Sequence, residues 1–117
     1  MPEDPSAAAQ RELSRGTVEL AVLALIQTKP RYGYDLLTSL GAATGGSLSI
    51  KEGTLYPVLH RLEDAGHIEA TWQAEGRAAP RKYYGITKQG KERLTLLRGE
   101  WDRLASGLSQ LLGGPGG

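Results

Sequence analysis

The chain has 117 residues, with 14 lysines and arginines against 13 acidic residues, a net charge of +1 and no cysteine. This length fits one domain that can bury a core without cross-links. The lack of cysteine excludes disulfides and thiolate metal sites and suits a reducing compartment, so we expect a cytoplasmic protein. The longest apolar run, 20–26, is far shorter than the ~20 residues that cross a bilayer, so we expect no membrane partner. Residues 1–10 have no basic residue before an apolar core, so we expect no secretory signal.

The two ends of the chain have compositions that do not favour a folded core. Residues 1–12 are rich in proline, alanine and acidic residues and predict a flexible N-terminal extension. Residues 113–117 read Gly-Gly-Pro-Gly-Gly and predict a flexible tail. We assign 13–87 to one folded domain and 88–112 to a separate C-terminal helix.

The first predicted helix runs from about Ser14, a candidate N-cap, to Gln27. Most of its apolar residues follow one helical stripe, but Leu20 and Leu23 fall on another face. A helix that is apolar on two sides is buried on two sides, which indicates a contact beyond its own domain.

Two more helices are predicted, over about 32–44 and within 51–65, each followed by glycine. For the second of these, Ser49 and Glu52 have the spacing of a capping box, although the N-cap could lie one or two residues later. Pro57 would remove one hydrogen bond inside the helix, which predicts either a late start or a slight bend.

Alternating apolar residues predict a two-stranded hairpin after these helices. The alternation involves Ile68, Ala70, Trp72, Tyr84 and Ile86. The connection over 73–80 is too long for a two-residue turn, so it should project as a loop.

The last predicted helix runs from about Lys88 to Leu112, with Thr87 as its N-cap. Six apolar residues along it recur at intervals of 3, 4, 3, 4 and 3, the a/d seam of a coiled coil. They are Leu94, Leu97, Trp101, Leu104, Leu108 and Leu111. The seam could pack on its own domain, but the other elements have little surface to cover a helix of roughly 37 Å. We therefore expect a homodimer interface formed by the six seam residues with Leu20 and Leu23.

Basic residues gather around the predicted hairpin although the net charge is small. Between 73 and 93, six basic residues stand against two acidic ones. Such a segment can bind phosphate, although on charge alone a solvated surface explains it equally well.

Three helices, a hairpin and a long helix predict a mainly α (α+β) fold, a winged helix-turn-helix with a long C-terminal dimerisation helix. In this architecture the third helix enters the major groove of double-stranded DNA, and the hairpin contacts the backbone or the minor groove. The candidate DNA-binding residues are Lys51, Thr54, Tyr56, His60, Arg61, Arg77, Arg81 and Lys82. Arg61 has two open roles, since it could contact guanine or pair with Glu63, Asp64 or a backbone carbonyl.

The sequence does not favour an enzyme. The only histidines are His60 and His67, no lysine follows the glycine pairs as in a phosphate-binding loop, and no serine lies in a nucleophile elbow. His60 and Asp64 have metal-binding spacing, but a surface pair explains them more simply. We expect no catalytic residue, no metal and no cofactor. The alternative to DNA binding is a winged helix that binds protein, which would need an apolar outer face on the third helix.

Several segments together are characteristic of one family. They are Tyr32–Leu36, Glu52–Glu63, Gly66–Ile68, and Arg81–Tyr84 followed by Ile86 and Thr87. With them the chain resembles the PadR-like transcriptional regulators over roughly 13–112. The resemblance implies a repressor that binds a pseudo-palindromic operator as a homodimer, with the C-terminal helix of one subunit packed on the terminal helices of the other.

The single C-terminal helix resembles that of the short PadR-like subfamily, which includes multidrug-sensing repressors. In those proteins a flat aromatic drug can stack between tryptophans at the dimer interface. The resemblance makes Trp101 the candidate ligand-binding residue for a small aromatic effector. The other interpretation of Trp101 is an ordinary core residue of the dimer.

Overall fold

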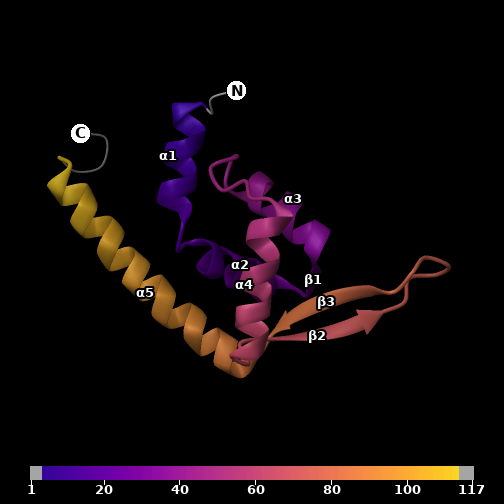
Figure 1. Cartoon of the computed structure of the whole chain (residues 1–117). Helices are drawn as coiled ribbons and strands as arrows, with labels where there is room; N and C mark the ends of the chain where they lie inside the picture. Colours follow the sequence, from indigo (N-terminus) through magenta and orange to yellow (C-terminus); the bar gives the residue numbers. More distant parts are fainter. Residues whose placement is uncertain (1–3, 114–117) are drawn as a thin grey trace.

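The computed structural model describes residues 4–113. Within this range the chain forms helices and strands in the order shown in Figure 1. They are α1 (Pro5–Ser14), α2 (Val18–Thr28), β1 (Arg31–Tyr32), α3 (Gly33–Ala43), α4 (Glu52–Asp64), β2 (Ile68–Gln73), β3 (Arg81–Ile86) and α5 (Lys88–Leu111). Within this part of the chain, no helix combines the length and apolar character that spanning a membrane requires.

The core lies between α2, α3, α4 and the small sheet. Its buried side chains are almost all aliphatic, and they follow the helical and strand periodicities of the sequence. They are Val18, Val22, Leu23, Ile26, Leu36, Leu40, Leu48, Leu55, Val58, Leu59, Leu62, Ile68, Tyr84 and Leu94. The three central helices and the hairpin therefore form the winged-helix body that the sequence predicts.

The N-terminal segment is helical where the sequence predicts a flexible extension over 1–12. Asp4 caps α1 by accepting a hydrogen bond from the Ser6 N–H at 3.0 Å, and Pro5 occupies the first helical position. None of the residues of α1 is buried, so the helix forms from local signals that a search for apolar stripes overlooks. Residues 1–3 lie outside the described part of the chain, as does most of the predicted tail.

The first predicted helix starts later than expected, because the chain turns between α1 and α2. Gly16 adopts a φ of 90°, which interrupts the helical path, and Thr17 rather than Ser14 is the N-cap of α2. The capping box of Ser49 and Glu52 does not form at the start of α4, and the N-cap lies two residues later, within the range that the sequence allows. Lys51 is the N-cap and has no side-chain cap, while the Ser49 hydroxyl donates to the Gly46 carbonyl instead.

The sheet has a third strand that the sequence analysis did not predict. Its order is β1-β3-β2, so β3 is central and pairs antiparallel with both neighbours. β1 is only two residues long, which is too short to show an alternating pattern. In the register, Tyr83 lies opposite Tyr32 on one side and Thr71 on the other.

Helix α5 begins as predicted and then leaves the body. The Thr87 hydroxyl accepts from the Gly90 N–H at 3.0 Å and donates to the Gly66 carbonyl at 2.6 Å, which fixes the first turn of the helix. Leu94 and Leu97 pack on the core, and beyond them the helix projects away from α3 and α4 (Figure 1).

The predicted dimer interface therefore needs a correction. Leu23 has no exposed surface and Leu94 has only 6%, because both side chains fill the core of their own subunit. Neither can offer appreciable surface to a second subunit. Packing on its own domain thus explains the first part of the seam.

Candidate nucleic-acid interface

Helix α4 presents a polar surface opposite its buried stripe. With one residue about every 100°, the buried leucines place His60 near the middle of the outer face. Thr54 and Arg61 lie on one flank, and Tyr56 lies on the other. All four residues are exposed, as is Lys51 at the N-cap.

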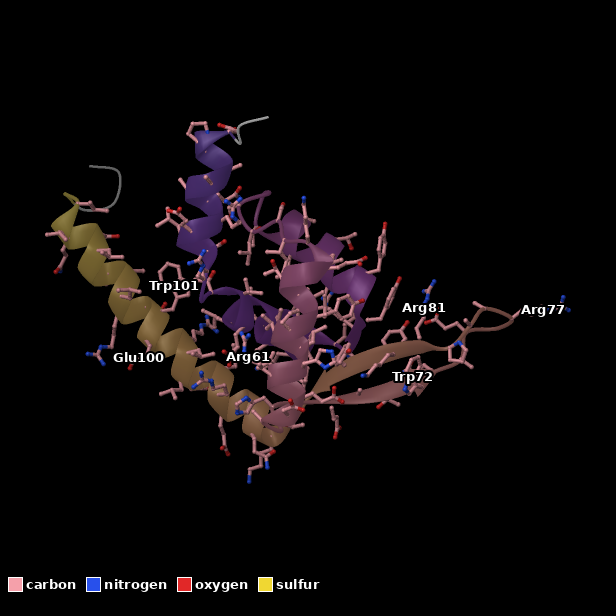
Figure 2. All side chains as sticks on the ribbon, viewed as in Figure 1. Arg61, Trp72, Arg77, Arg81, Glu100 and Trp101 are labelled. Atoms are coloured by element: carbon pink, nitrogen blue, oxygen red, sulfur yellow. The ribbon has the colours of Figure 1, made fainter. Side chains whose placement is uncertain are left out.

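The two flanks of α4 adjoin different parts of the molecule. Lys51 and Thr54 line a concavity with α1, whereas Arg61 lines a second one with Glu19 of α2 and Arg93 of α5. Figure 2 shows Arg61 on the α5 side, away from the hairpin. Glu63, one of the partners considered for Arg61, pairs instead with Lys82 at 3.7 Å.

The hairpin does not bring Arg81 and Lys82 together. Consecutive residues of a strand point to opposite faces, so these two side chains diverge. The Arg81 guanidinium lies 4.6 Å from the ring centre of Tyr32, and the Lys82 ammonium lies 5.4 Å from that of Tyr84. Their aromatic neighbours hold both cations close to the sheet.

Glu75 partly neutralises the positive charge on the face of the hairpin that carries Arg81 and Tyr83. Its carboxylate accepts from Arg81 at 3.2 Å and from the Tyr83 hydroxyl, and the hydrogen bond from Tyr83 raises the pKa of that tyrosine above its usual value of 10.0. Arg77 lies at the far end of the hairpin, well beyond this pair (Figure 2). Among the cations of the hairpin, Arg77 is therefore the one best placed to reach a nucleic-acid backbone at a distance from α4.

The structure adds an aromatic surface that the sequence analysis missed. Tyr34 and Trp72 are each 67% exposed, and with Tyr56 they line a concavity of about 360 Å³ between α3, α4 and the hairpin. Trp72 follows the alternation of a core residue, but its partner in the register is Lys82, beyond the end of the core. The exposure of Trp72 had one sequence signal. The apolar alternation of β2 continues beyond the part of the strand that the helices can cover.

Gly33 sets the position of Tyr56 in this surface. A Cβ atom at Gly33 would overlap the Tyr56 hydroxyl and lie 3.0 Å from Cζ, so the ring packs directly on the first turn of α3. A glycine at this point lets the two helices approach each other closely.

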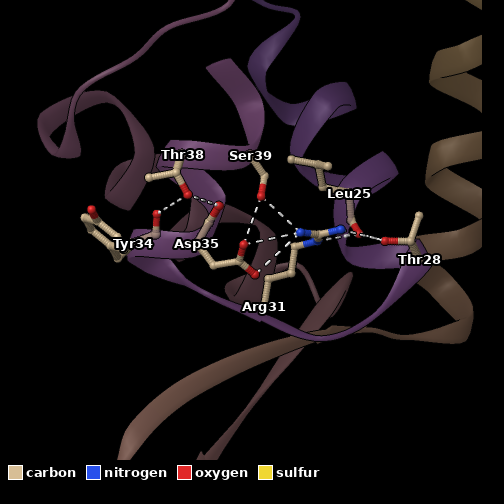
Figure 3. Close-up of polar contacts among 7 residues, drawn as sticks. All are labelled: Leu25, Thr28, Arg31, Tyr34, Asp35, Thr38 and Ser39. Carbon is tan, nitrogen blue, oxygen red and sulfur yellow. Dashed lines mark hydrogen bonds and ion pairs between the residues drawn. The ribbon is translucent and has the colours of Figure 1, made fainter. Parts of the chain in front are cut away.

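Arg31 fixes the start of α3 relative to the end of α2 (Figure 3). Its Nε donates to the Leu25 carbonyl at 3.0 Å, and its two terminal nitrogens donate to Thr28, Asp35 and Ser39. The side chain is only 13% exposed, and Asp35 also accepts from the Ser39 hydroxyl at 2.9 Å. One guanidinium therefore holds the exposed Tyr34 turn in place.

The remaining seam residues lie on the projecting part of α5. Trp101 is 47% exposed and borders two concavities, one of about 570 Å³ with α1 and α2 and one of about 490 Å³ with Arg98 and Asp102. Leu104, Leu108 and Leu111 are also exposed, while Leu20 is partly buried against the core. Leu13 of α1 is exposed and lines the same concavity as Trp101, although it was not among the residues predicted for the interface.

No three metal-ligating side chains converge within residues 4–113. His60 and Asp64 both lie on the exposed face of α4.

Comparison with known proteins places this architecture in a family. Residues 22–96 match the Transcriptional regulator PadR-like family. An uncharacterized protein X of Lysinibacillus sphaericus is 41% identical over 90 residues, which cover 77% of this chain and 83% of that protein. The negative transcriptional regulator PadR of Bacillus subtilis is 30% identical over 77 residues, which cover 66% of this chain and 42% of that protein.

A crystal structure of a PadR family transcriptional regulator from Eggerthella lenta shares the fold. Its TM-score is 0.79 at 37% sequence identity, and the match covers 92% of each chain. The family and its structural neighbours are transcriptional regulators rather than enzymes. The chain is a DNA-binding transcription regulator of winged-helix fold, and it belongs to the PadR-like family.

Proposed function

We propose that the chain is a repressor that acts as a homodimer and binds a pseudo-palindromic operator through α4 and the β2–β3 hairpin of each subunit. The observation that carries this proposal is the exposed apolar side of α5, which provides a surface for a second subunit. The same chain has a polar outer face on α4, which provides a surface for DNA. The repressor role is supported by the Bacillus subtilis relative, which is named a negative transcriptional regulator.

The dimer is supported by the apolar surface on the projecting half of α5. Trp101, Leu104, Leu108 and Leu111 remain exposed, although a helix of this apolar spacing is stable only when its seam is covered. Gly99 and Gly107 weaken the isolated helix further, since each costs about 1 kcal/mol relative to alanine. A second copy of the same seam, with Leu13 and Leu20 at its edge, would cover these side chains.

DNA contact is supported by the chemistry of the exposed side chains. Thr54, Tyr56 and His60 offer hydrogen-bonding groups along α4, and Lys51 supplies a cation at its start. Arg77, at the far end of the hairpin, would reach the DNA backbone at a distance from the groove that α4 occupies. The polar outer face of α4 favours DNA over a protein partner, which would require apolar surface there.

Release by an effector is the finer part of the proposal. Trp101 borders concavities whose lining is largely apolar, and the resemblance to drug-sensing relatives makes a flat aromatic molecule the expected ligand. In a dimer the two copies of Trp101 would belong to the same interface. A ligand stacked there would act on the arrangement of the two α4 helices.

Footprinting on the DNA that flanks the gene tests the DNA-binding proposal. We expect protection of two half-sites with inverted sequence, about one helical turn apart. Protection of one asymmetric half-site at saturation would exclude the dimer, and no protected site would exclude an operator in this DNA.

A further inference from the structure

We propose that α1 extends the DNA-binding surface, with Arg15 binding backbone phosphate beside the contacts made by Lys51 at the start of α4. The inference rests on the proposed function, because it needs DNA on the α4 surface. It concerns a helix that lies wholly before the 22–96 segment matched to the family.

The position of α1 is the first observation. Figure 1 shows α1 rising from the start of α2 on the side of the body where the loop between α3 and α4 lies. Arg15, Arg11, Lys51 and Thr54 line one concavity of about 490 Å³ between α1 and the beginning of α4. A backbone that follows the outer face of α4 past Lys51 would therefore meet α1 next.

The charge of this concavity is the second observation. Among the residues of 4–113 that line it, Arg11, Arg15 and Lys51 are cationic and none is acidic. Two other concavities that α4 borders differ from it: one contains the acidic residues Glu19 and Asp64, and the other mixes cations with aromatic rings. A concave surface that carries several cations, with Arg15 and Lys51 exposed, suits the phosphodiester backbone better than a single acidic protein side chain, because the charge of that backbone repeats along its length.

The attachment of α1 is the third observation. The Gln10 side-chain amide donates to the Gly46 carbonyl at 2.8 Å and to the Ser47 carbonyl at 2.5 Å. These bonds fasten α1 to the loop between α3 and α4, the same loop that leads into the N-cap of α4. Since no residue of α1 is buried, Gln10 is a positioning residue that holds Arg15 near Lys51.

The salt dependence of binding to a fluorescein-labelled random-sequence DNA duplex tests the inference without knowledge of the operator. Each phosphate contact adds about one to the slope of log affinity against log salt. We expect Arg15→Ala to lower the slope by about one for each subunit that contacts the duplex, and Arg15→Glu to lower the affinity further. Arg103→Ala is the matched control, because Arg103 pairs with Glu100 on the outer side of α5 and should leave the slope unchanged (Figure 2).

A second pair of variants tests the role of Gln10. Gln10→Ala should reduce the slope in the otherwise native protein, but should have no further effect when Arg15 is already alanine. An equal effect of Gln10→Ala in both backgrounds would show that Gln10 does not act through Arg15.

The outcomes separate this inference from the proposed function. If Lys51→Ala lowers the slope while Arg15→Ala behaves like Arg103→Ala, α1 is not part of the surface and the repressor proposal stands. If the native protein binds the duplex without salt dependence, this result excludes both the proposed DNA-binding surface on α4 and its extension by α1.

Discussion

At Gly33 and Gly90 an added methyl group would overlap other parts of the chain, but the atoms that it would overlap differ. At Gly33 the methyl group would meet the outer end of the Tyr56 side chain, which can rotate away. At Gly90 it would overlap the His67 carbonyl oxygen, which belongs to the backbone and accepts a hydrogen bond from the Thr87 N–H at 3.1 Å.

The two alanine substitutions should therefore have different effects. Gly90→Ala should lower the free energy of unfolding by about 1–3 kcal/mol, because backbone must move to admit the methyl group. Gly33→Ala should leave the fold intact and reduce DNA affinity by displacing Tyr56. Urea unfolding and DNA titration measure both effects.

Gly99→Ala is the control for the intrinsic effect of alanine. A methyl group there would meet nothing within 4 Å, so this variant should be stabilised by up to about 1 kcal/mol. If Gly90→Ala proved as stable as Gly99→Ala, the tight contact between α5 and His67 would be wrong.

The sequence predicted the elements whose apolar residues repeat, and it missed those that form by other means. The apolar stripes of α3, α4 and α5 and the alternation in β2 were sufficient to place these elements. α1 forms through Asp4 and Pro5 and is attached by Gln10, none of which contributes an apolar stripe. β1 was missed because two residues cannot show alternation.

The candidate site was predicted in part, for a similar reason. The exposed polar residues of α4 follow directly from its buried stripe. The sequence could not reveal Trp72 as exposed, because its place beyond the core depends on the register of β2 and β3. The divergence of Arg81 and Lys82 follows from strand alternation, which the sequence analysis applied only to the apolar residues of the hairpin. Leu23 was misplaced because periodicity identifies an apolar face but not what covers it.

At the scale of elements, the junction between α2 and α3 depends on one side chain. Replacing Arg31 with lysine keeps the charge but removes the planar fork that bonds to Thr28, Asp35 and Ser39. We expect Arg31→Lys to lower the free energy of unfolding by about 1–3 kcal/mol, as measured by urea unfolding.

Arg103→Lys provides the comparison, because the Arg103 side chain is 80% exposed. Within residues 4–113 its ion-pair partner is Glu100, one turn earlier on the same helix. Its effect should stay within about 0.5 kcal/mol. Equal stability of the two lysine variants would mean that the Arg31 bonds contribute nothing net.

At the scale of the whole molecule, the projecting half of α5 should hold two subunits together. Leu108→Asp should weaken the dimer at least roughly tenfold, because burial of a leucine is worth about 1.5–3 kcal/mol and a carboxylate would oppose burial. Sedimentation velocity across a concentration series measures the association.

Leu96 supplies the matched control on the same helix. It is 57% exposed but lies off the seam, so Leu96→Asp should dimerise like the native chain. Loss of dimers in both variants would point to a general disturbance of α5, and loss in neither would remove the seam from the interface.

The effector proposal predicts a change in tryptophan fluorescence. The chain has two tryptophans, and planar cationic drugs should quench the emission of Trp101 by stacking on it. Quenching should persist in Trp72→Phe and disappear in a Trp101→Ala protein that still dimerises. If Trp101→Ala retained the full quenching, the ligand would lie at Trp72 instead.

The central place of β3 has a consequence for how such a regulator can diversify. Its register is fixed twice, by β1 on one side and by β2 on the other, so a one-residue slip would exchange the environments of Tyr83 and Tyr84. The loop over 74–80 lies outside both ladders. Insertions and deletions can therefore accumulate in this loop, altering the stretch of DNA that it reaches, while α4 keeps its setting in the body.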